Sequence, residues 1–113
     1  MEVFLSKKQA KQTKDPTSLR REFGKAGDEI ADCLNVLKAV DTLQELLSMP
    51  PALNHRCHEL HKNLKDTFSM DLVHPYRLLF RPADPIPRRD DNGVDYIHVR
   101  IVVIKDLHAN THE

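Results

Sequence analysis

The fold of this chain is decided by residues 58–81, which read HELHKNLKDTFSMDLVHPYRLLFR. Apolar and polar side chains alternate here, and successive side chains of a strand point to opposite faces of a sheet. One face is expected to be the core face, and it carries Phe68, Met70, Leu72, Tyr76, Leu78 and Phe80. Arg77, Leu79 and Arg81 share the other face of the last strand. The segment predicts three short strands with cationic groups on the open face of a small sheet.

The rest of the chain changes from a helical pattern in its first half to an alternating pattern in its second half. Helices are predicted from Asp15-Pro16, where an aspartate N-cap precedes proline, from about Asp28, and over residues 42–49 after a possible Asp41 cap. Gly24 and Gly27 are expected to end or break the first helix. Strands are predicted at 1–6, 55–61, 66–73, 76–82 and 95–105.

The connections and the last strand complete the expected architecture. Pro82 to Gly93 holds three prolines, charges and an Asn-Gly pair, which indicates an exposed loop. The β-branched residues of 95–105 are typical of a central strand that is covered on both faces. The expected fold is α+β, with an N-terminal strand and two to three helices packed on one face of a mostly antiparallel, four- to five-stranded sheet.

Length and composition predict one soluble globular domain over residues 1–113, with 40% hydrophobic and 30% charged residues. No segment has the apolar length that spans a bilayer, and the N-terminus lacks the pattern of a secretory signal. Cys33 and Cys57 form no CxxC pair, so we expect free thiols, buried or half-buried, in a reducing, cytoplasmic compartment.

The formal net charge is zero, but the charge is unevenly distributed. Residues 1–25 hold seven Lys/Arg against three acids and residues 54–89 hold seven against four, whereas residues 26–53 and 90–113 are acidic. The overall balance argues against a strong nucleic-acid footprint, and the two basic blocks leave a local one open.

Histidine is abundant, with seven in the chain, but the pattern does not indicate a metal site. On a strand, the spacing of His55, His58 and His61 puts neighbours on opposite faces, and no CxxC or HExxH accompanies them. A glycine-rich phosphate loop and a Gly-x-Ser-x-Gly elbow are also absent, which disfavours NTP hydrolysis and acyl transfer. No metal or other cofactor is expected.

The remaining candidates are the imidazole and cationic groups that the sheet brings together. They are His58, His61, Lys62, Lys65, Arg77, Arg81 and His108, with Asp106 two residues before His108. RNA cleavage needs a base for the 2′-hydroxyl, an acid for the leaving 5′-oxygen, and fixed positive charge for the phosphorane. Histidine and arginine supply these groups, and an aspartate at i, i+2 on a strand can orient an imidazole.

At these residues the sequence resembles the RelE/ParE toxin superfamily, and within it the HigB-type plasmid maintenance killer proteins. The matching pieces run through most of the chain. They are Phe4-Leu5-Ser6-Lys7-Lys8, Arg21-Glu22-Phe23-Gly24, Leu43-Gln44-Glu45-Leu46-Leu47 before Pro50-Pro51, His58-Glu59-Leu60, Phe68-Ser69-Met70-Asp71-Leu72, Tyr76-Arg77-Leu78-Leu79-Phe80, Pro82, and the terminal Asp106-Leu107-His108.

The resemblance implies a small RelE-like toxin of a type II toxin–antitoxin system that cleaves mRNA on the ribosome without a metal and thereby arrests translation. It places His58, Arg77, Asp106 and His108 in catalysis, and His61, Lys62, Lys65 and Arg81 in RNA binding. The implied partners are the ribosome, mRNA and a cognate HigA-like antitoxin with a helix-turn-helix domain. Operator DNA would be bound only through the antitoxin complex, and no membrane partner is implied.

Two departures from the family pattern keep other functions open. The family turn is usually Lys-Gly-Asp-Arg-Lys-Gly, whereas residues 61–66 here read HKNLKD, and Leu107 replaces a frequent tyrosine. Together with zero net charge, this predicts weaker affinity for ribosomal RNA than a basic relative has. The alternatives are a non-enzymatic, ParE-like inhibitor of DNA gyrase, and a degenerate toxin that retains only antitoxin binding.

Overall fold

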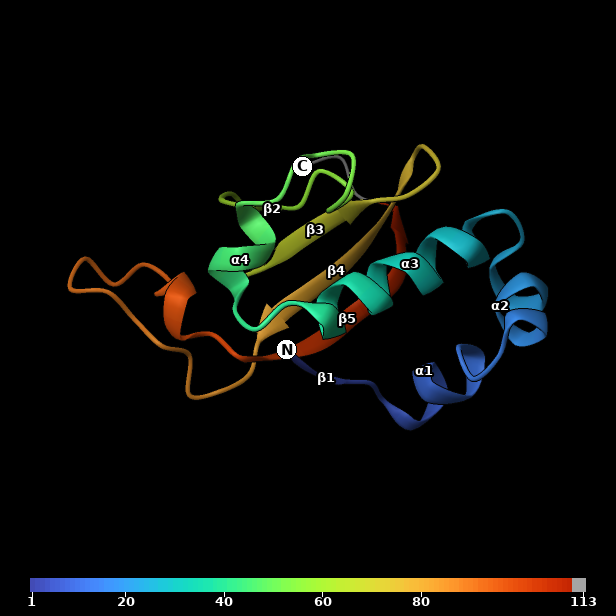
Figure 1. The fold of residues 1–113 in the computed structure, drawn as a ribbon, viewed down its shortest axis with the longest axis horizontal. Coiled ribbons are helices and arrows are strands. Elements are labelled where there is room, and N and C mark those ends of the chain that lie inside the picture. The colour runs from blue at the N-terminus through green and yellow to red at the C-terminus, as the bar shows by residue number, and fades with distance from the viewer. Residues whose placement is uncertain (111–113) are drawn as a thin grey trace.

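A five-stranded sheet organises the chain in the computed structural model, which describes residues 1–110 (Figure 1). Its strands are β1 (Glu2–Phe4), β2 (His58–Glu59), β3 (Phe68–Asp71), β4 (Tyr76–Pro82) and β5 (Ile101–Asn110). They lie in the order β1-β5-β4-β3-β2, with β1 parallel to β5 and the other pairs antiparallel. The α+β class with a mostly antiparallel sheet is therefore confirmed.

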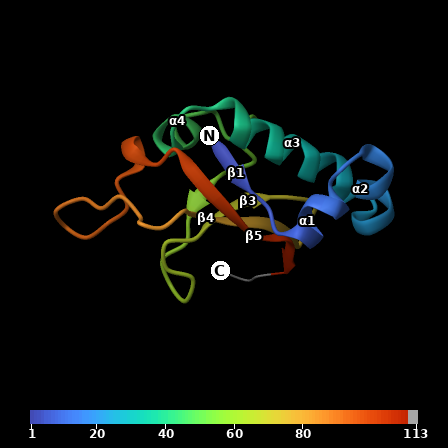
Figure 2. The same cartoon turned by 90° about the horizontal axis from the view of Figure 1, so that it is seen from below.

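Four α-helices occur in the described part of the chain, more than the two to three expected: α1 (Lys7–Gln12), α2 (Pro16–Phe23), α3 (Ala26–Ala39) and α4 (Leu43–Leu47). Figure 2 shows α3 and α4 on one side of the sheet, with α1 and α2 at one end. Asp15 caps α2 as predicted, because its side chain accepts from Ser18 N at 2.7 Å. The cap of α4 is Thr42 rather than Asp41.

Helix α3 supplies most of the helical side of the core. Its buried face carries Ile30, Cys33, Leu34 and Leu37, which belong to one hydrophobic cluster with Phe68, Met70, Leu78, Phe80, Val102 and Ile104 of the sheet. Gly24 ends α2 with a φ of 58°, as expected. Gly27 instead lies inside α3, where a Cβ would approach the carbonyl oxygen of Leu19 to 2.8 Å. Close packing of α2 on α3 therefore requires this glycine.

The predicted strand over 55–61 is wrong at both ends, because β2 contains only His58 and Glu59. His55 and Arg56 have left-handed φ values of 53° and 51°, which a strand does not allow. The His55 ring instead lies 2.6 Å from Asp32 Oδ2 and 3.2 Å from the carbonyl oxygen of Asp71. These contacts attach the segment before β2 to α3 and to β3.

The last strand begins later than predicted and continues further. Residues Tyr96–His98 form a 3₁₀ turn, and β5 runs from Ile101 to Asn110. Burial alternates along β5, with Val102 and Ile104 buried and Ile101 and Lys105 exposed, so the expected strand with two covered faces is wrong. The predicted loop after Pro82 is confirmed, and it projects from the molecule before the chain returns to β5 (Figure 1).

A smaller apolar cluster covers part of the sheet face opposite the helices. It contains Leu60, Leu79 and Ala109, with Leu64 of the β2–β3 loop packed against it. Cys33 and Cys57 are free and buried, as predicted, and burial raises the pKa of both thiols. Within residues 1–110, no helix combines the length and apolar character that crossing a membrane requires.

Candidate functional site

The sheet register places two of the predicted catalytic residues in one row. His58 pairs with Ser69, Ser69 with Leu79, and Leu79 with Asp106, so the row crosses β2, β3, β4 and β5. With strands about 4.8 Å apart, the backbones of His58 and Asp106 are separated by roughly 14 Å. Arg77 is two residues from Leu79 on β4 and pairs with Asp71 and Ala109. Arg77 therefore occupies the next row of the sheet.

Two groups of contacts contain the four predicted catalytic residues, one with His58 and Arg77 and one with Asp106 and His108, and we refer to them together as the catalytic track. The His58 ring contacts the carbonyl oxygen of Arg56 at 2.9 Å, and Arg56 Nε lies 3.1 Å from Asp71 Oδ2. Asp71 Oδ1 lies 3.8 Å from Arg77 Nε.

The second group of contacts surrounds His108 on β5. The ring of Tyr76, adjacent to Arg77, stacks on the His108 ring with centroids 3.8 Å apart. Phe23 of α2 contacts the same imidazole edge-on at 5.7 Å. Asp106 Oδ1 accepts a hydrogen bond from the backbone N–H of His108 at 2.9 Å. Asp106 therefore fixes the main chain at His108, whereas Tyr76 and Phe23 orient its ring.

The tautomer of His58 follows from its partner. A carbonyl oxygen can only accept a hydrogen bond, so the contact to Arg56 requires the proton on Nδ1 of His58. In the neutral ring, Nε2 is then the proton acceptor. His58 is half-buried, and this tautomer leaves Nε2 as the ring nitrogen that a general base would use.

The predicted RNA-binding residues lie in a second area, around the β2–β3 loop. His61, Lys62 and Lys65 are exposed in this loop, and they line a hollow together with Arg89 and Tyr96. The Tyr96 hydroxyl donates a hydrogen bond to Glu59, and the Arg89 guanidinium lies over the Tyr96 ring at 5.5 Å. Burial raises the pKa of the Tyr96 hydroxyl. The loop after β4 thus forms one wall of the hollow.

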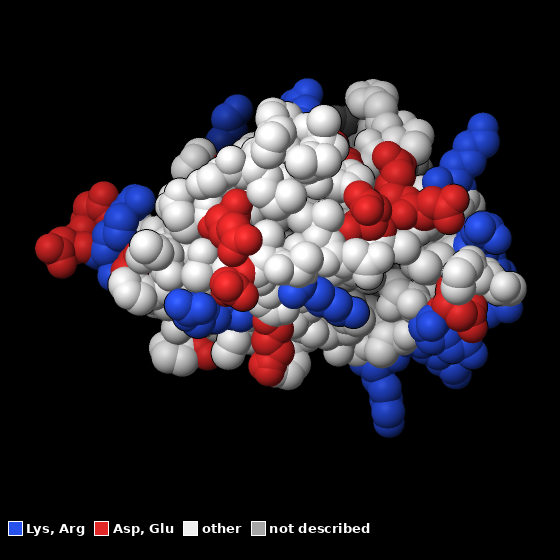
Figure 3. All heavy atoms as spheres, viewed as in Figure 1, with Lys and Arg blue, Asp and Glu red and all other residues white. Residues whose placement is uncertain are grey.

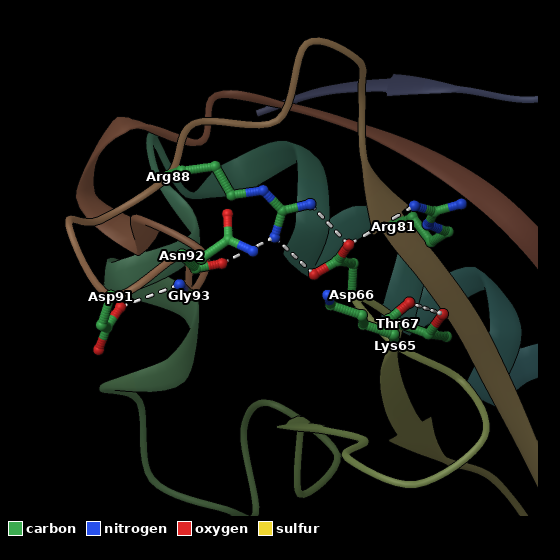
Figure 4. A network of polar contacts seen from close by, with 8 residues as sticks. All are labelled: Lys65, Asp66, Thr67, Arg81, Arg88, Asp91, Asn92 and Gly93. Carbon is green, nitrogen blue, oxygen red and sulfur yellow. Dashed lines mark hydrogen bonds and ion pairs between the residues drawn. The ribbon is translucent and has the colours of Figure 1, made fainter.

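Asp66 holds the β2–β3 loop and the loop after β4 together. Both of its carboxylate oxygens accept hydrogen bonds from Arg88 at 2.8 Å, and Arg81 Nη2 lies 3.8 Å from Oδ2 (Figure 4). The hydrogen bonds from Arg88 lower the pKa of the buried Asp66 carboxyl. The Asp66 carboxylate therefore partly neutralises the charge of Arg81, a predicted RNA-binding residue. In the sequence, Asp66 is part of the turn that departs from the family pattern.

A third cationic area surrounds His108. Lys8, Gln9 and Gln12 of α1 line a hollow that also contains Asp106 and His108. Figure 3 shows basic side chains gathered over α1 and α2, whereas acidic side chains lie over α3 and α4. The basic residues of these two helices are Lys7, Lys8, Lys11, Arg20 and Arg21. Positive charge is thus present beside His108 and scarce on the α3–α4 face.

Sequence reasoning did not find Arg56, Asp71, Tyr76 or Arg88 as parts of these sites. Tyr76 and Asp71 lay within the quoted strands, where alternation predicts the face of a side chain but not its partner. Within residues 1–110, no group of three or more His, Cys, Asp or Glu side chains is arranged to hold a metal ion.

Comparisons with models of known protein families, with curated proteins and with solved structures found no match.

Proposed function

We propose that this protein is a HigB-type toxin of a type II toxin–antitoxin system and cleaves mRNA on the ribosome without a metal. The catalytic track carries the proposal, because contacts link His58 of β2 to Arg77 of β4, and His108 of β5 to Asp106 and to Tyr76 of β4. Residues from β2, β4 and β5 are brought together in this way only by the sheet topology.

The proposed roles follow from the order of the groups along the track. His58 takes the proton of the 2′-hydroxyl through Nε2, since its Nδ1 is committed to the Arg56 carbonyl. Arg77 stabilises the negative charge that develops on the phosphorane. His108 protonates the leaving 5′-oxygen, and its stacking on Tyr76 holds the ring in place.

RNA binding is proposed for the two cationic areas that flank the track. His61, Lys62, Lys65 and Arg81 flank it on the β2–β3 side, and the basic residues of α1 and α2 flank it beside His108. Phosphate contacts of this kind supply affinity without sequence information. The acidic face over α3 and α4 is unsuited to RNA (Figure 3).

The proposal includes a cognate antitoxin, expected to be HigA-like, that neutralises the toxin by covering the cationic sheet or the helical face. Operator DNA would be bound through the helix-turn-helix domain of that antitoxin. Co-expression of a cognate antitoxin should then restore growth that the toxin alone arrests.

Induced expression in a bacterial host tests the proposed function. We expect pulse-labelling to show rapid translation arrest and primer extension on an abundant mRNA to show new 5′ ends inside the reading frame. The variants His58→Ala and His108→Ala should lose both effects, whereas His98→Ala should retain them, because His98 lies on the 3₁₀ turn away from the track.

Two other outcomes would replace this proposal. Arrest with induction of the DNA-damage response and intact mRNA would indicate a gyrase inhibitor. A folded, soluble protein that causes no arrest would indicate a degenerate toxin that retains antitoxin binding alone.

A further inference from the structure

A hollow of about 500 Å³ lies where the β3–β4 hairpin meets the segment before β2. Its polar lining comes from Arg56, Asp71, His74 and Arg77, and Tyr76 also contributes to its wall. Arg77 and Tyr76 belong to the catalytic track, so the hollow opens beside the proposed site of cleavage. The Arg56 side chain has no role in the proposed mechanism, although it lines this hollow next to Arg77.

Arg56 and Arg77 approach the same carboxylate from different elements. Arg56 Nε lies 3.1 Å from Asp71 Oδ2, and Arg77 Nε lies 3.8 Å from Asp71 Oδ1. The backbone fixes this arrangement, because Asp71 N–H donates to the His55 carbonyl at 2.7 Å and Arg56 adopts a left-handed φ of 51°. Asp71 therefore orients two guanidinium groups toward one hollow.

The charges in the hollow select the class of anion. Two guanidinium groups and one carboxylate give a net charge of one positive unit. This charge matches a phosphodiester, which carries a single negative charge, better than a phosphate monoester or free phosphate, which approaches two at neutral pH. Arginine also suits the planar arrangement of phosphodiester oxygens through paired N–H donors.

We propose that Arg56 binds a backbone phosphodiester of RNA adjacent to the one that is cleaved, that Arg77 binds the cleaved one, and that Asp71 positions both guanidinium groups. The inference rests on the proposed ribonuclease function and extends it, because it assigns a second phosphate position and a substrate-binding residue. Arg56 holds the strand in register, while Arg77 contacts the phosphate on which His58 and His108 act.

Salt-dependent binding of an uncleavable RNA to the purified full-length protein tests this assignment. The probe is a short 2′-O-methyl oligoribonucleotide, which lacks the hydroxyl needed for cleavage, with inorganic phosphate as a competitor. Loss of one phosphate contact should reduce the slope of log K against log salt by about 0.7 for a single strand. We expect Arg56→Gln to show this change and to lower affinity roughly tenfold.

Arg100→Gln is the matched control. Arg100 is exposed, as Arg56 is, and it lies outside the track and both proposed RNA-binding areas. We expect Arg100→Gln to retain the wild-type slope and affinity. Arg56→Lys should retain the slope, because the charge remains, and lose part of the affinity, because the planar group is removed.

The outcomes separate this inference from the proposed function. Equal slopes for Arg56→Gln and Arg100→Gln, in variants with unchanged circular dichroism and thermal midpoints, would overturn the Arg56 assignment even if the wild type cleaves mRNA. Binding that inorganic phosphate displaces at concentrations near those of the oligonucleotide would overturn the phosphodiester preference. Absence of mRNA cleavage by the wild type would overturn the proposed function, whatever the binding slopes are.

Discussion

Asn54 provides a direct test of how the segment before β2 is held, and therefore of how Arg56 and His58 are placed. Its side chain is only 3% exposed. The Nδ2 amide donates to the carbonyl oxygens of Leu46 at 2.9 Å and Met49 at 3.3 Å. Its Oδ1 accepts from Cys57 N at 3.4 Å. Asn54 thus satisfies carbonyls at the end of α4 and fixes the start of β2.

Asn54→Ala removes these three hydrogen bonds and leaves buried backbone groups without partners. A net hydrogen bond contributes about 0.5–1.5 kcal/mol, and an unsatisfied buried group costs about 1–3 kcal/mol. The Cys57 contact is long, so we expect a loss of about 2–3 kcal/mol in the free energy of unfolding. For a domain of this size, that loss lowers the thermal midpoint by roughly 10 °C.

Urea denaturation followed by circular dichroism measures this change, with Asn35→Ala as the control because Asn35 is exposed on α3. The control should change the free energy of unfolding by less than about 0.5 kcal/mol. The reasoning would be refuted if Asn54→Ala were no more destabilising than the control.

Three further predictions concern packing, charge and thiol reactivity. Gly27→Ala should destabilise by about 1–3 kcal/mol, because its Cβ would meet the Leu19 carbonyl oxygen at 2.8 Å; a variant as stable as the wild type would contradict the close contact. The hydrogen bonds from Arg88 lower the pKa of Asp66 in the folded protein. The ionised carboxylate therefore stabilises the fold at pH values above the pKa of Asp66 in the unfolded chain, about 3.9. This stabilisation is lost as the pH falls through the lower pKa that Asp66 has in the folded protein. The stability difference between wild type and Asp66→Asn should therefore be constant above about pH 5 and shrink in more acidic solution, and a difference that grows on acidification would be inconsistent with this. Burial raises the pKa of Cys57 to about 12, so iodoacetamide at pH 8 should label it only after unfolding, and rapid labelling of the native protein would exclude the buried thiol.

The strands β3 and β4 could be predicted because apolar and polar residues alternate along them, and this pattern is visible in the local sequence. Phe68, Met70, Leu78 and Phe80 are all fully buried, as the pattern of apolar positions required. The short β2 could not be predicted, since the left-handed backbone at His55 and Arg56 depends on contacts with α3 and β3. Helix α1 was missed because it buries no residue and therefore shows no apolar periodicity.

The candidate site was only partly accessible from the sequence. The resemblance to HigB-type toxins selected Arg77 and His108, but the stacking of His108 on Tyr76 requires the register of β4 against β5. Asp66 stood out in the sequence only as the acid that ends the departing turn HKNLKD, whereas its contact with Arg88 depends on where the loop after β4 folds back. Contacts between distant segments carry no periodic signal in the sequence.

Cleavage of a defined mRNA on programmed bacterial ribosomes by the purified protein tests the central claim most directly. The account predicts new 5′ ends at the codon in the ribosomal A site, formed in the presence of a metal chelator that leaves the ribosomes intact. It also predicts a loss of at least about 100-fold in single-turnover rate for Arg77→Ala and His108→Ala, with His98→Ala unchanged. Cleavage that Arg77→Ala and His108→Ala both retain at the wild-type rate would contradict the account.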